Sequence, residues 1–389
     1  MNIIIIPSWY ESKRRPTLGS FFKEQAIALA KNGHKVTLVF PGLVGSREVF
    51  DCNIKLKSYN ENGITVYRVD TPGFGINRFE KIDEKLFSLK LKYIINKVIK
   101  KEGKPDIVHA HSCIWAGYSA VKIFKSLGIP VVITEHSTAF PKNEIKGYKE
   151  RCVRTCINEA SGIITVSNGL KESLGKYNDN NKEIKVIPNM FNEELFNSEH
   201  IKRTESKFRF VSVCYLSHKK GIDILLESFC KSFKGNNSVE LLIGGQGEKY
   251  NDLVNLSIDL GIEKQVRFLG DLKRDDVANL IANSDVFALP SRFETFGVVF
   301  IEALALGKPI IASKCGGPED IVNDKNGLLV EVENIEALSN AMVQIYKNYK
   351  NYDKDKIIED CKARFSETSI VNQLEQYYGH IIRKSKIIE

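Results

Sequence analysis

The sequence lacks the features that mark membrane-spanning, secreted and metal-binding proteins. No apolar run approaches the ~18 residues of a membrane span, and the first residues, Met-Asn-Ile-Ile-Ile-Ile-Pro, lack the basic segment of a signal peptide. The eight cysteines form no CxxC pair, and Cys152 and Cys156 stand four residues apart, which only places them on one helix face. They are expected to be reduced and mostly buried, as in a cytosolic protein. We therefore expect a cytoplasmic chain, and docking on the inner face of a membrane stays open.

The excess of basic over acidic residues is also modest. The 389 residues carry 56 basic and 48 acidic side chains, for a net charge of +8. This diffuse charge suits an anionic substrate or an anionic membrane face, and it predicts no nucleic-acid partner. The turn Gly244-Gly245-Gln246-Gly247 lacks the G-x-G-x-x-G spacing of dinucleotide-binding proteins, which argues against a dehydrogenase.

Short β-branched runs alternate with helical patterns along the chain. In the first half the predicted strands are 2–6, 36–40, 64–69, 107–110, 131–134 and 163–166. This alternation predicts an α/β fold with doubly wound parallel sheets. The length favours about two domains, and the polar stretch 193–207, which follows Ile187-Pro188-Asn189, places the boundary there. We assign residues 1–190 to the first domain and 191–366 to the second.

The most informative stretch runs from Ser291 to Pro318 and contains Glu294 and Glu302. Its pattern predicts a loop, a short helix beginning near Phe296–Gly297, a glycine stop and a buried strand. Glu302 is the only polar residue in nine, so its carboxylate is expected to be buried and to need hydrogen-bond donors, which a ligand diol would supply. The helix N-terminus after Glu294 offers amides suited to phosphate. Ribose diol, phosphate and a sugar hydroxyl near Glu294 together indicate a nucleotide-sugar.

The strings SRFETFG, EALALGKPIIAS and the following GG resemble the E-x7-E signature of the family-four retaining glycosyltransferases. These enzymes have the GT-B fold, in which two Rossmann-like domains face a cleft. The resemblance implies that Glu302 contacts the donor ribose and that Glu294 lies near the transferred sugar. It also implies that backbone amides beside Phe296, Gly297 and Val298 hold the donor diphosphate. It covers nearly the whole chain and is strongest from 208 to 330.

Residues Tyr215 to Gly221 resemble the Gly-Arg-Leu-x3-Lys-Gly element of the same family. Lys220 is retained, and a lysine at a helix start, in a loop after a strand, is well placed as a point charge for phosphate. Tyr215 stands where the family usually has Arg, so one of the two cations expected on the diphosphate is missing. Lys219 or Arg292 is expected to compensate, unless the donor is held differently.

Two glycines are expected close to the donor. The family places a glycine-rich turn like that around Gly245 beside the donor, and a tight turn between a strand and a helix is the alternative role. Gly19 precedes the first helix, where a glycine lets the backbone approach a ligand or simply makes a turn. The opening of the chain, from Pro7-Ser8-Trp9-Tyr10 through Gly19, is similar to that of many family members, in which this loop faces the donor phosphate and the acceptor.

Three histidines of the first half lie at the ends of predicted strands. His136 follows the strand 131–134, and ligands of open α/β sheets bind at the carboxyl ends of strands. The resemblance places it beside the transferred sugar, and a structural histidine bonded to backbone is the alternative. His109 and His111 would suit a metal, but no third ligand lies nearby in the sequence. The resemblance implies that they line the interdomain cleft. We expect no metal and no cofactor.

Two predicted helical stretches are rich in lysine and arginine, at 84–104 and 142–154. Such runs are usually solvated helix faces, and the other interpretation is a surface for anionic lipid. Many members of the family act on lipid-linked acceptors and use the N-terminal domain in this way, so the resemblance adds a possible anionic membrane surface to the expected partners.

The resemblance implies a retaining glycosyltransferase that moves a sugar from a nucleotide-sugar, with a UDP-sugar favoured, to a hydroxyl. The expected acceptor is a lipid-linked or growing glycan of bacterial surface polysaccharide. By analogy the donor binds the second domain, the acceptor binds the first, and a final helix within 367–389 packs back on the first. Two alternatives remain: a nucleotide-sugar 2-epimerase of the same fold, and a catalytically silent subunit of a polysaccharide assembly complex, which the departure at Tyr215 keeps open.

Overall fold

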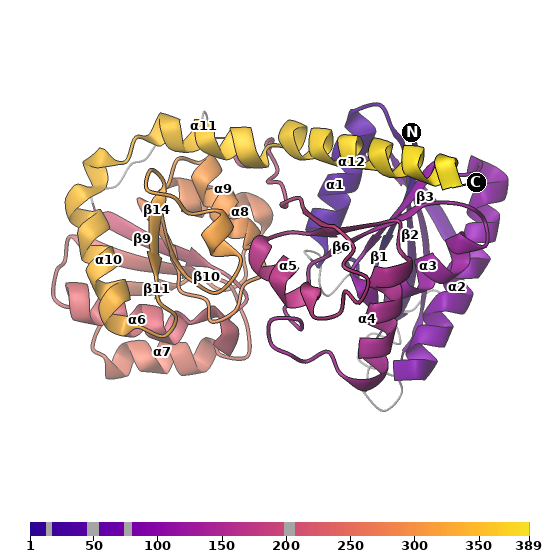
Figure 1. Cartoon of the computed structure of the whole chain (residues 1–389). Helices are drawn as coiled ribbons and strands as arrows, with labels where there is room; N and C mark the ends of the chain where they lie inside the picture. Colours follow the sequence, from indigo (N-terminus) through magenta and orange to yellow (C-terminus); the bar gives the residue numbers. More distant parts are fainter. Residues whose placement is uncertain (13–17, 45–53, 74–79, 198–206, 389) are drawn as a thin grey trace. The chain divides into compact units, whose positions relative to one another are not determined.

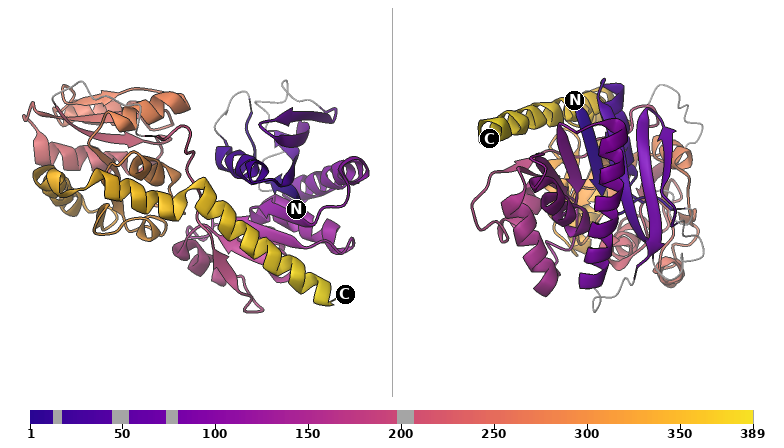
Figure 2. Two further views of the ribbon diagram at one scale, coloured as in Figure 1. Left: turned by 90° about the horizontal axis from the view of Figure 1, so that it is seen from above. Right: turned by 90° about the vertical axis from the view of Figure 1, so that its right-hand side faces the viewer.

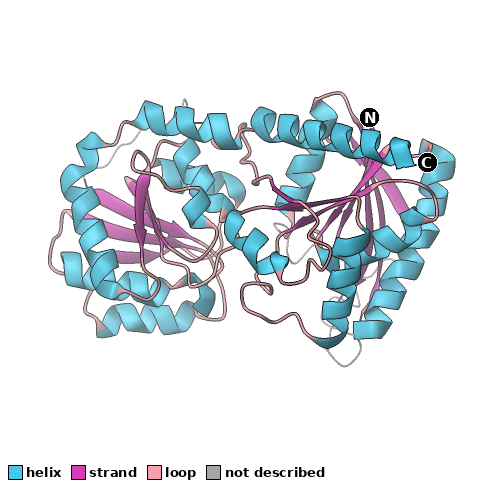
Figure 3. Ribbon diagram, viewed as in Figure 1, coloured by secondary structure: helices cyan, strands magenta, loops and turns pink. Residues whose placement is uncertain are grey.

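The computed structural model describes residues 1–12, 18–44, 54–73, 80–197 and 207–388 (Figure 1). The chain forms two compact units: Met1–Pro188 together with Ile370–Glu389, and Asn189–Ser369. The predicted boundary lies at residue 190, and residues 367–389 are predicted to pack on the first domain. Each unit contains one sheet, and helices cover both faces of each sheet (Figure 3). This architecture confirms the predicted α/β class with two parallel-sheet domains.

The first unit is built on an eight-stranded sheet with the order β3-β4-β2-β1-β5-β6-β7-β8. All neighbouring strands are parallel except β3 and β4. The strands are β1 (Asn2–Pro7), β2 (Lys35–Val44), β3 (Lys57–Glu61), β4 (Ile64–Pro72), β5 (Ile107–His111), β6 (Val131–Glu135), β7 (Gly162–Thr165) and β8 (Ile184–Val186). Strand β3 is not among the predicted strands, because this edge strand is polar and mostly exposed, whereas buried β-branched runs form the central strands.

The helices of the first unit pack their apolar faces on this sheet. They are α1 (Ser20–Lys31), α2 (Glu80–Glu102), α3 (Tyr118–Lys125), α4 (Gly147–Glu159), α5 (Asn168–Gly175) and α12 (Glu367–Ile388). An irregular turn, Cys113–Gly117, precedes α3. From Ile370 onward α12, the yellow helix of Figure 2, belongs to the first unit. There it buries Leu374, Tyr378 and Ile381 at helical spacing.

The second unit contains six parallel strands in the order β11-β10-β9-β12-β13-β14. Counted from its first strand the order is 3-2-1-4-5-6, that of the Rossmann fold. The strands are β9 (Phe208–Val213), β10 (Val239–Gly244), β11 (Val266–Phe268), β12 (Val286–Leu289), β13 (Ile310–Ser313) and β14 (Gly327–Val330). The helices are α6 (Ile222–Phe233), α7 (Tyr250–Asp259), α8 (Arg274–Ala282), α9 (Val298–Ala305), α10 (Ile335–Asn348) and α11 (Lys354–Phe365).

The strand order locates the place for a ligand in each unit. The order reverses between β1 and β5 in the first unit and between β9 and β12 in the second. In open parallel sheets, ligands bind at such a switch point, outside the carboxyl ends of the strands. The loops that follow these strands are therefore where functional side chains are sought.

Candidate functional site

Two loops meet at the switch point of the second unit. The loop after β9 contains a short helical turn, His218–Lys220, and the loop after β12 begins at Pro290. The backbone N–H of Arg292 donates to the carbonyl of Lys219 over 2.7 Å, which ties one loop to the other. The pairing fixes where the side chains that follow each strand are presented.

Lys220 and Glu294 form an ion pair between these loops. The Lys220 Nζ lies 2.5 Å from Glu294 Oε2, and the two side chains are only 15% and 11% exposed. Burial acts to lower the pKa of Lys220, but attraction to the Glu294 carboxylate outweighs it, and the pKa lies above the ordinary lysine value. The site thus holds a fixed positive charge beside a carboxylate that can accept a hydroxyl proton in a hydrogen bond.

The N-terminus of α9 lies directly after Glu294. Gly297 precedes the helix with φ 93°, in the left-handed region, and a Cβ there would lie 2.5 Å from the Phe300 ring. The N-cap residue Gly297 has no side chain with which to cap this helix. Amides of the first turn, beginning at Val298, therefore suit an anion. Phe296 is 1% exposed and anchors the turn in the core. The predicted helix near Phe296–Gly297 is confirmed.

Glu302 is buried on α9, as its apolar neighbours predicted, and it is 2% exposed. Arg274 Nη1, from the first residue of α8, donates to Glu302 Oε1 over 2.5 Å. The Arg274 guanidinium also lies 5.2 Å from the centre of the Phe196 ring. A ligand diol is the predicted donor to Glu302, and Arg274, which precedes Glu302 by 28 residues, is not predicted. Arg274 orients the carboxylate, whose two oxygens together can accept several further hydrogen bonds.

The Arg292 guanidinium holds the loops together through several hydrogen bonds. Its guanidinium donates to both carboxylate oxygens of Asp223 (2.9 and 2.8 Å), to Glu333 (2.8 Å) and to the carbonyl of His218 (2.7 Å). The hydrogen bond to Asp223 is the main reason that the pKa of Arg292 is raised. These bonds hold the loop in place, and the expected contact of Arg292 with the donor diphosphate stays a prediction. For Lys219 the structure fixes the backbone, and the role of its ammonium stays a prediction.

The loop that carries Tyr215, where the chain departs from the family pattern, lies close to the glycine-rich turn around Gly245. Tyr215, which stands in place of the usual Arg, is 62% exposed. Gly245 follows β10 with φ 126°, and a Cβ there would lie 1.9 Å from the carbonyl oxygen of Cys214. Only glycine allows this approach of two loops. The glycine-rich turn thus abuts the loop that carries Lys220, and its predicted contact with a donor stays a prediction.

The first unit gathers three histidines at its own switch point. His136 follows β6, is 9% exposed, and has its Nε2 3.1 Å from Nδ1 of His111, the last residue of β5. Burial is the main cause that lowers the pKa of His136 to about 3, so its ring is neutral. The rings of Phe21 and Phe22, from α1, pack on it with centroids 4.9 and 5.2 Å away. Gly19 immediately precedes α1. The first unit therefore brings Gly19, His111 and His136, all predicted from the sequence, into one region.

A buried carboxylate that the sequence analysis missed organises these strand ends. Glu135 is 1% exposed. Its Oε1 accepts hydrogen bonds from the backbone N–H groups of His136 and Ser137, both over 2.8 Å, and from Ser112 Oγ over 3.0 Å. Its Oε2 accepts from the backbone N–H of Cys113 over 2.8 Å. These bonds satisfy the charge and fix the backbone around His136. A glutamate at the end of a buried strand was the available signal.

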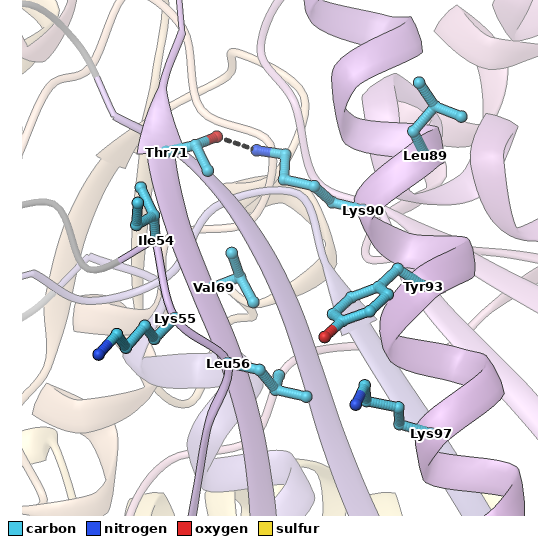
Figure 4. A pocket seen from close by; sticks show the side chains of 9 residues that line it. All are labelled: Ile54, Lys55, Leu56, Val69, Thr71, Leu89, Lys90, Tyr93 and Lys97. Atoms are coloured by element: carbon cyan, nitrogen blue, oxygen red, sulfur yellow. Dashed lines mark hydrogen bonds between the residues drawn. The ribbon is translucent and has the colours of Figure 1, made fainter.

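A groove of about 720 Å³ lies between α2 and the segment 54–56 of the first unit (Figure 4). Apolar side chains around it are exposed, with Ile54 at 71%, Leu89 at 66% and Tyr93 at 52%. Lys55 and Lys97 stand at its rim. The α2 part of the predicted cation-rich stretch thus combines ammonium groups with exposed apolar surface. None of the helices formed by the described residues combines the length and apolar character needed to span a bilayer.

Two family models together match most of this chain. A model of the group 1 glycosyl transferases matches residues 193–360, and a model of glycosyltransferase family 4 matches residues 18–195. The N-acetyl-alpha-D-glucosaminyl L-malate synthase of Bacillus anthracis is 26% identical over 370 residues, which cover 92% of this chain and 92% of that protein.

Solved structures share the fold over nearly the full length. A sucrose-phosphate synthase of Thermosynechococcus elongatus superposes with a TM-score of 0.80 at 18% identity and covers 99% of this chain and 100% of its own. HepE of Anabaena, in complex with UDP and glucose, superposes with a TM-score of 0.73 at 18% identity over 98% of this chain and 100% of its own. At these identities the likeness concerns the fold.

Proposed function

Because the chain belongs to the group 1, family-four-like glycosyltransferases, which have the GT-B fold, we propose that it moves a sugar from a nucleotide-sugar to an acceptor hydroxyl with retention of anomeric configuration. The observation that carries this proposal is the constellation at the switch point of the second unit. There a largely buried ammonium–carboxylate pair, Lys220 and Glu294, precedes α9, whose N-cap is Gly297 and which carries the buried carboxylate of Glu302.

The donor parts match these groups one by one. Lys220 and the α9 amides beside Phe296, Gly297 and Val298 bind the diphosphate, because both present positive charge to an anion. Glu302 accepts hydrogen bonds from the ribose diol, and Arg274 holds its carboxylate in place. Glu294 accepts from a hydroxyl of the transferred sugar. UDP is the favoured nucleotide, which is supported by the structure of HepE in complex with UDP and glucose.

The proposed reaction depends on stabilising the leaving group. The bond between the anomeric carbon and the diphosphate oxygen breaks while the acceptor oxygen bonds to the same face of that carbon. The acceptor proton passes to the leaving diphosphate. Lys220 and the α9 amides stabilise the negative charge that develops there, and they are in place before the reaction begins. Glu294 is held by Lys220 rather than presented as a carboxylate nucleophile.

A transfer assay tests this proposal. The protein is incubated with UDP-, GDP- and ADP-sugars and a panel of hydroxyl acceptors, and the product anomer is identified by NMR. We expect an acceptor-dependent glycoside with the donor's anomeric configuration, formed equally well in EDTA because Lys220 and backbone amides supply the positive charge. Inversion of the anomer would exclude the front-face reaction. Loss of activity in EDTA would show that a metal takes part, and free epimerised sugar would identify an epimerase.

The acceptor in this proposal is a lipid-linked or growing glycan of the kind that builds bacterial surface polysaccharide, and the groove on α2 docks on the anionic membrane that carries it. Exposed apolar side chains such as Leu89 and Tyr93 insert at the interface, while Lys55 and Lys97 meet lipid phosphates. This assignment uses charge complementarity together with exposed apolar surface on one helix.

Vesicle binding tests the membrane assignment. Each lysine near an anionic surface contributes about 1 kcal/mol, so Lys55→Gln with Lys97→Gln is expected to weaken binding to anionic phospholipid vesicles by roughly 30-fold. The matched control changes Lys314 and Lys356 of the second unit to Gln, which alters net charge equally and should leave binding unchanged. Equal loss in both variants would mean that only net charge matters. Undiminished binding by the first variant would remove the groove from membrane docking.

A further inference from the structure

Three elements of the first unit begin at the carboxyl edge of its sheet. The turn Cys113–Gly117 follows β5, α2 is the next element after β4, and α4 is the next after β6. Strand β5 is one of the two strands at the switch point of this unit. Ligands of open parallel sheets bind outside the carboxyl ends of the strands. Side chains on this turn and on the first residues of α2 and α4 are therefore placed where a ligand of the first unit is expected.

The beginnings of α2 and α4 are held together by two polar contacts. Lys149 Nζ lies 2.7 Å from Glu80 Oε1. The Tyr148 hydroxyl donates to Glu84 Oε2 over 2.9 Å, and Glu84, which is 4% exposed, also accepts from Ser88 Oγ over 2.7 Å. Burial and the hydrogen bond to Glu84 raise the pKa of Tyr148, so its hydroxyl remains a donor. The Tyr148 ring is thus tethered at its polar end.

Two cations flank this tethered ring. Lys81 Nζ lies 5.6 Å and Arg151 Cζ lies 5.8 Å from the centre of the Tyr148 ring. Both cationic side chains are exposed, and neither forms an ion pair with any residue that the structure describes. The neighbouring carboxylates have other partners: Glu150 pairs with Arg154 over 3.0 Å, as the first carboxylate of α2 does with α4. Two unpaired positive charges therefore stand beside one fixed aromatic ring.

A second aromatic ring adjoins that of Tyr148. The Trp115 ring, from the turn after β5, has its centre 6.2 Å from that of Tyr148, and the two planes are inclined by 41°. Trp115 is partly exposed and lies four residues after the end of β5. An aromatic ring packs on the apolar face of a sugar, and ammonium and guanidinium groups pair with phosphate. The combination suits a sugar that carries a phosphate.

We infer that Lys81, Arg151 and the rings of Tyr148 and Trp115 form a subsite for a phosphorylated sugar, which, on the proposed function, belongs to the acceptor. Arg151 offers a planar fork to the phosphate, and Lys81 adds a point charge. Leu89, in the groove on α2, follows Lys81 by eight residues, about 12 Å along the helix. Where phosphate joins the acceptor sugar to a lipid, the lipid chain can continue from this subsite toward the groove.

Trp115 itself reports on binding. The chain contains two tryptophans, Trp9 and Trp115, so Trp9→Phe leaves Trp115 as the only one. Its fluorescence is followed while glucose 1-phosphate, inorganic phosphate or glucose is added to the full chain. We expect a saturable change with glucose 1-phosphate in the millimolar range, much weaker binding of inorganic phosphate and no response to glucose. Equal affinity for the two phosphates would overturn the sugar contact, and no response to glucose 1-phosphate would overturn the subsite.

Charge variants on the Trp9→Phe background test the two cations. Lys81→Gln with Arg151→Gln is expected to weaken glucose 1-phosphate binding by roughly tenfold, because two charge pairs near the surface are lost. Arg151→Lys keeps the charge and should retain most of the affinity. The matched control, Lys125→Gln with Lys185→Gln, removes two exposed charges of the same unit and should bind normally. Equal loss in both pairs, or no loss in the first, would overturn the inference.

A membrane surface offers the same phosphate chemistry, and vesicles distinguish the two sources. Phosphatidylglycerol vesicles are added to the Trp9→Phe protein before glucose 1-phosphate. We expect Trp115 to respond to glucose 1-phosphate with the vesicles present. If the vesicles change the Trp115 emission and glucose 1-phosphate does not, the subsite contacts lipid headgroups and its assignment to an acceptor sugar is wrong.

The consequence for turnover rests on the proposed function. In the transfer assay, Lys81→Gln with Arg151→Gln is expected to raise the KM of a phosphate-bearing acceptor by roughly tenfold. The donor KM and the KM of an uncharged acceptor should stay unchanged. An unchanged KM for the phosphate-bearing acceptor would overturn the acceptor assignment. If glucose 1-phosphate binding depends on both cations but no sugar is transferred to any acceptor, the subsite stands and the proposed function fails.

Discussion

Replacing Lys220 by alanine is expected to lower kcat by roughly 10²–10³-fold, the usual cost of removing one preorganised group that stabilises developing negative charge. The Lys220 ammonium is held in place, because its side chain is only 15% exposed and it is bonded to Glu294 over 2.5 Å. Its raised pKa keeps it charged throughout the neutral range. Donor KM should change less than kcat, because charge on the diphosphate is greatest as the sugar departs. Steady-state kinetics with the identified donor measure both quantities.

A lysine outside the site provides the control for Lys220. Lys314→Ala also removes one positive charge from the second unit, and its side chain is 49% exposed and paired with Glu331. We expect a much smaller loss of kcat in this variant. Because Lys220→Ala leaves the Glu294 carboxylate buried without its partner, Lys220→Met with Glu294→Gln distinguishes a lost charge from a local disturbance. Turnover of Lys220→Ala within a factor of two of the original would remove Lys220 from the mechanism.

Glu302→Ala is expected to raise the donor KM by roughly 10–100-fold, since a hydrogen bond to a charged group contributes about 1.5–3 kcal/mol. The residue is 2% exposed and meets the donor through the ribose, at a distance from the reacting bond, so kcat should fall less than kcat/KM. Comparing donor-concentration series for the two proteins measures the effect. Glu331→Ala, whose side chain is 63% exposed and paired with Lys314, is the control and should behave as the unchanged protein.

The loss of Glu302 also leaves Arg274 without this carboxylate. The additional change Arg274→Leu removes the uncompensated charge, and the double variant separates instability from lost ribose contact. If the donor KM of Glu302→Ala is unchanged in a folded protein, the ribose role of Glu302 is wrong.

The parts of the fold and the site that could be predicted from the sequence are those encoded by local pattern. The burial of Glu302 followed from its being the only polar residue in a run of nine, and the start of α9 followed from the Phe296–Gly297 pair. Alternating buried strands and helices predicted parallel sheets, because only a strand covered on both faces is apolar throughout. The edge strand β3 is polar and mostly exposed, so it lacks this apolar pattern and is not predicted.

The rest depends on contacts between residues far apart in the chain. Tyr378 bonds His109 across 269 positions, and Arg209, which is buried, pairs with Glu240 on the neighbouring strand. No local pattern indicates such partners. Arg292 shows the same limit: its place in the motif predicts a ligand contact, but it does not reveal the partners Asp223 and Glu333, which lie far from it in the sequence. The sequence shows which residue types could take part in the chemistry. Tertiary structure determines which partners they have.

The central claim, a nucleotide-sugar site in the second unit, is tested most directly by calorimetric titration of the protein with UDP, GDP and ADP, beside Glu302→Ala. The account predicts that one nucleotide, with UDP favoured, binds with one-to-one stoichiometry, and that Glu302→Ala weakens this binding by roughly 10–100-fold. Absence of binding by all three nucleotides to the folded protein would contradict the account, and the Tyr215 replacement would then mark a catalytically silent member of the family.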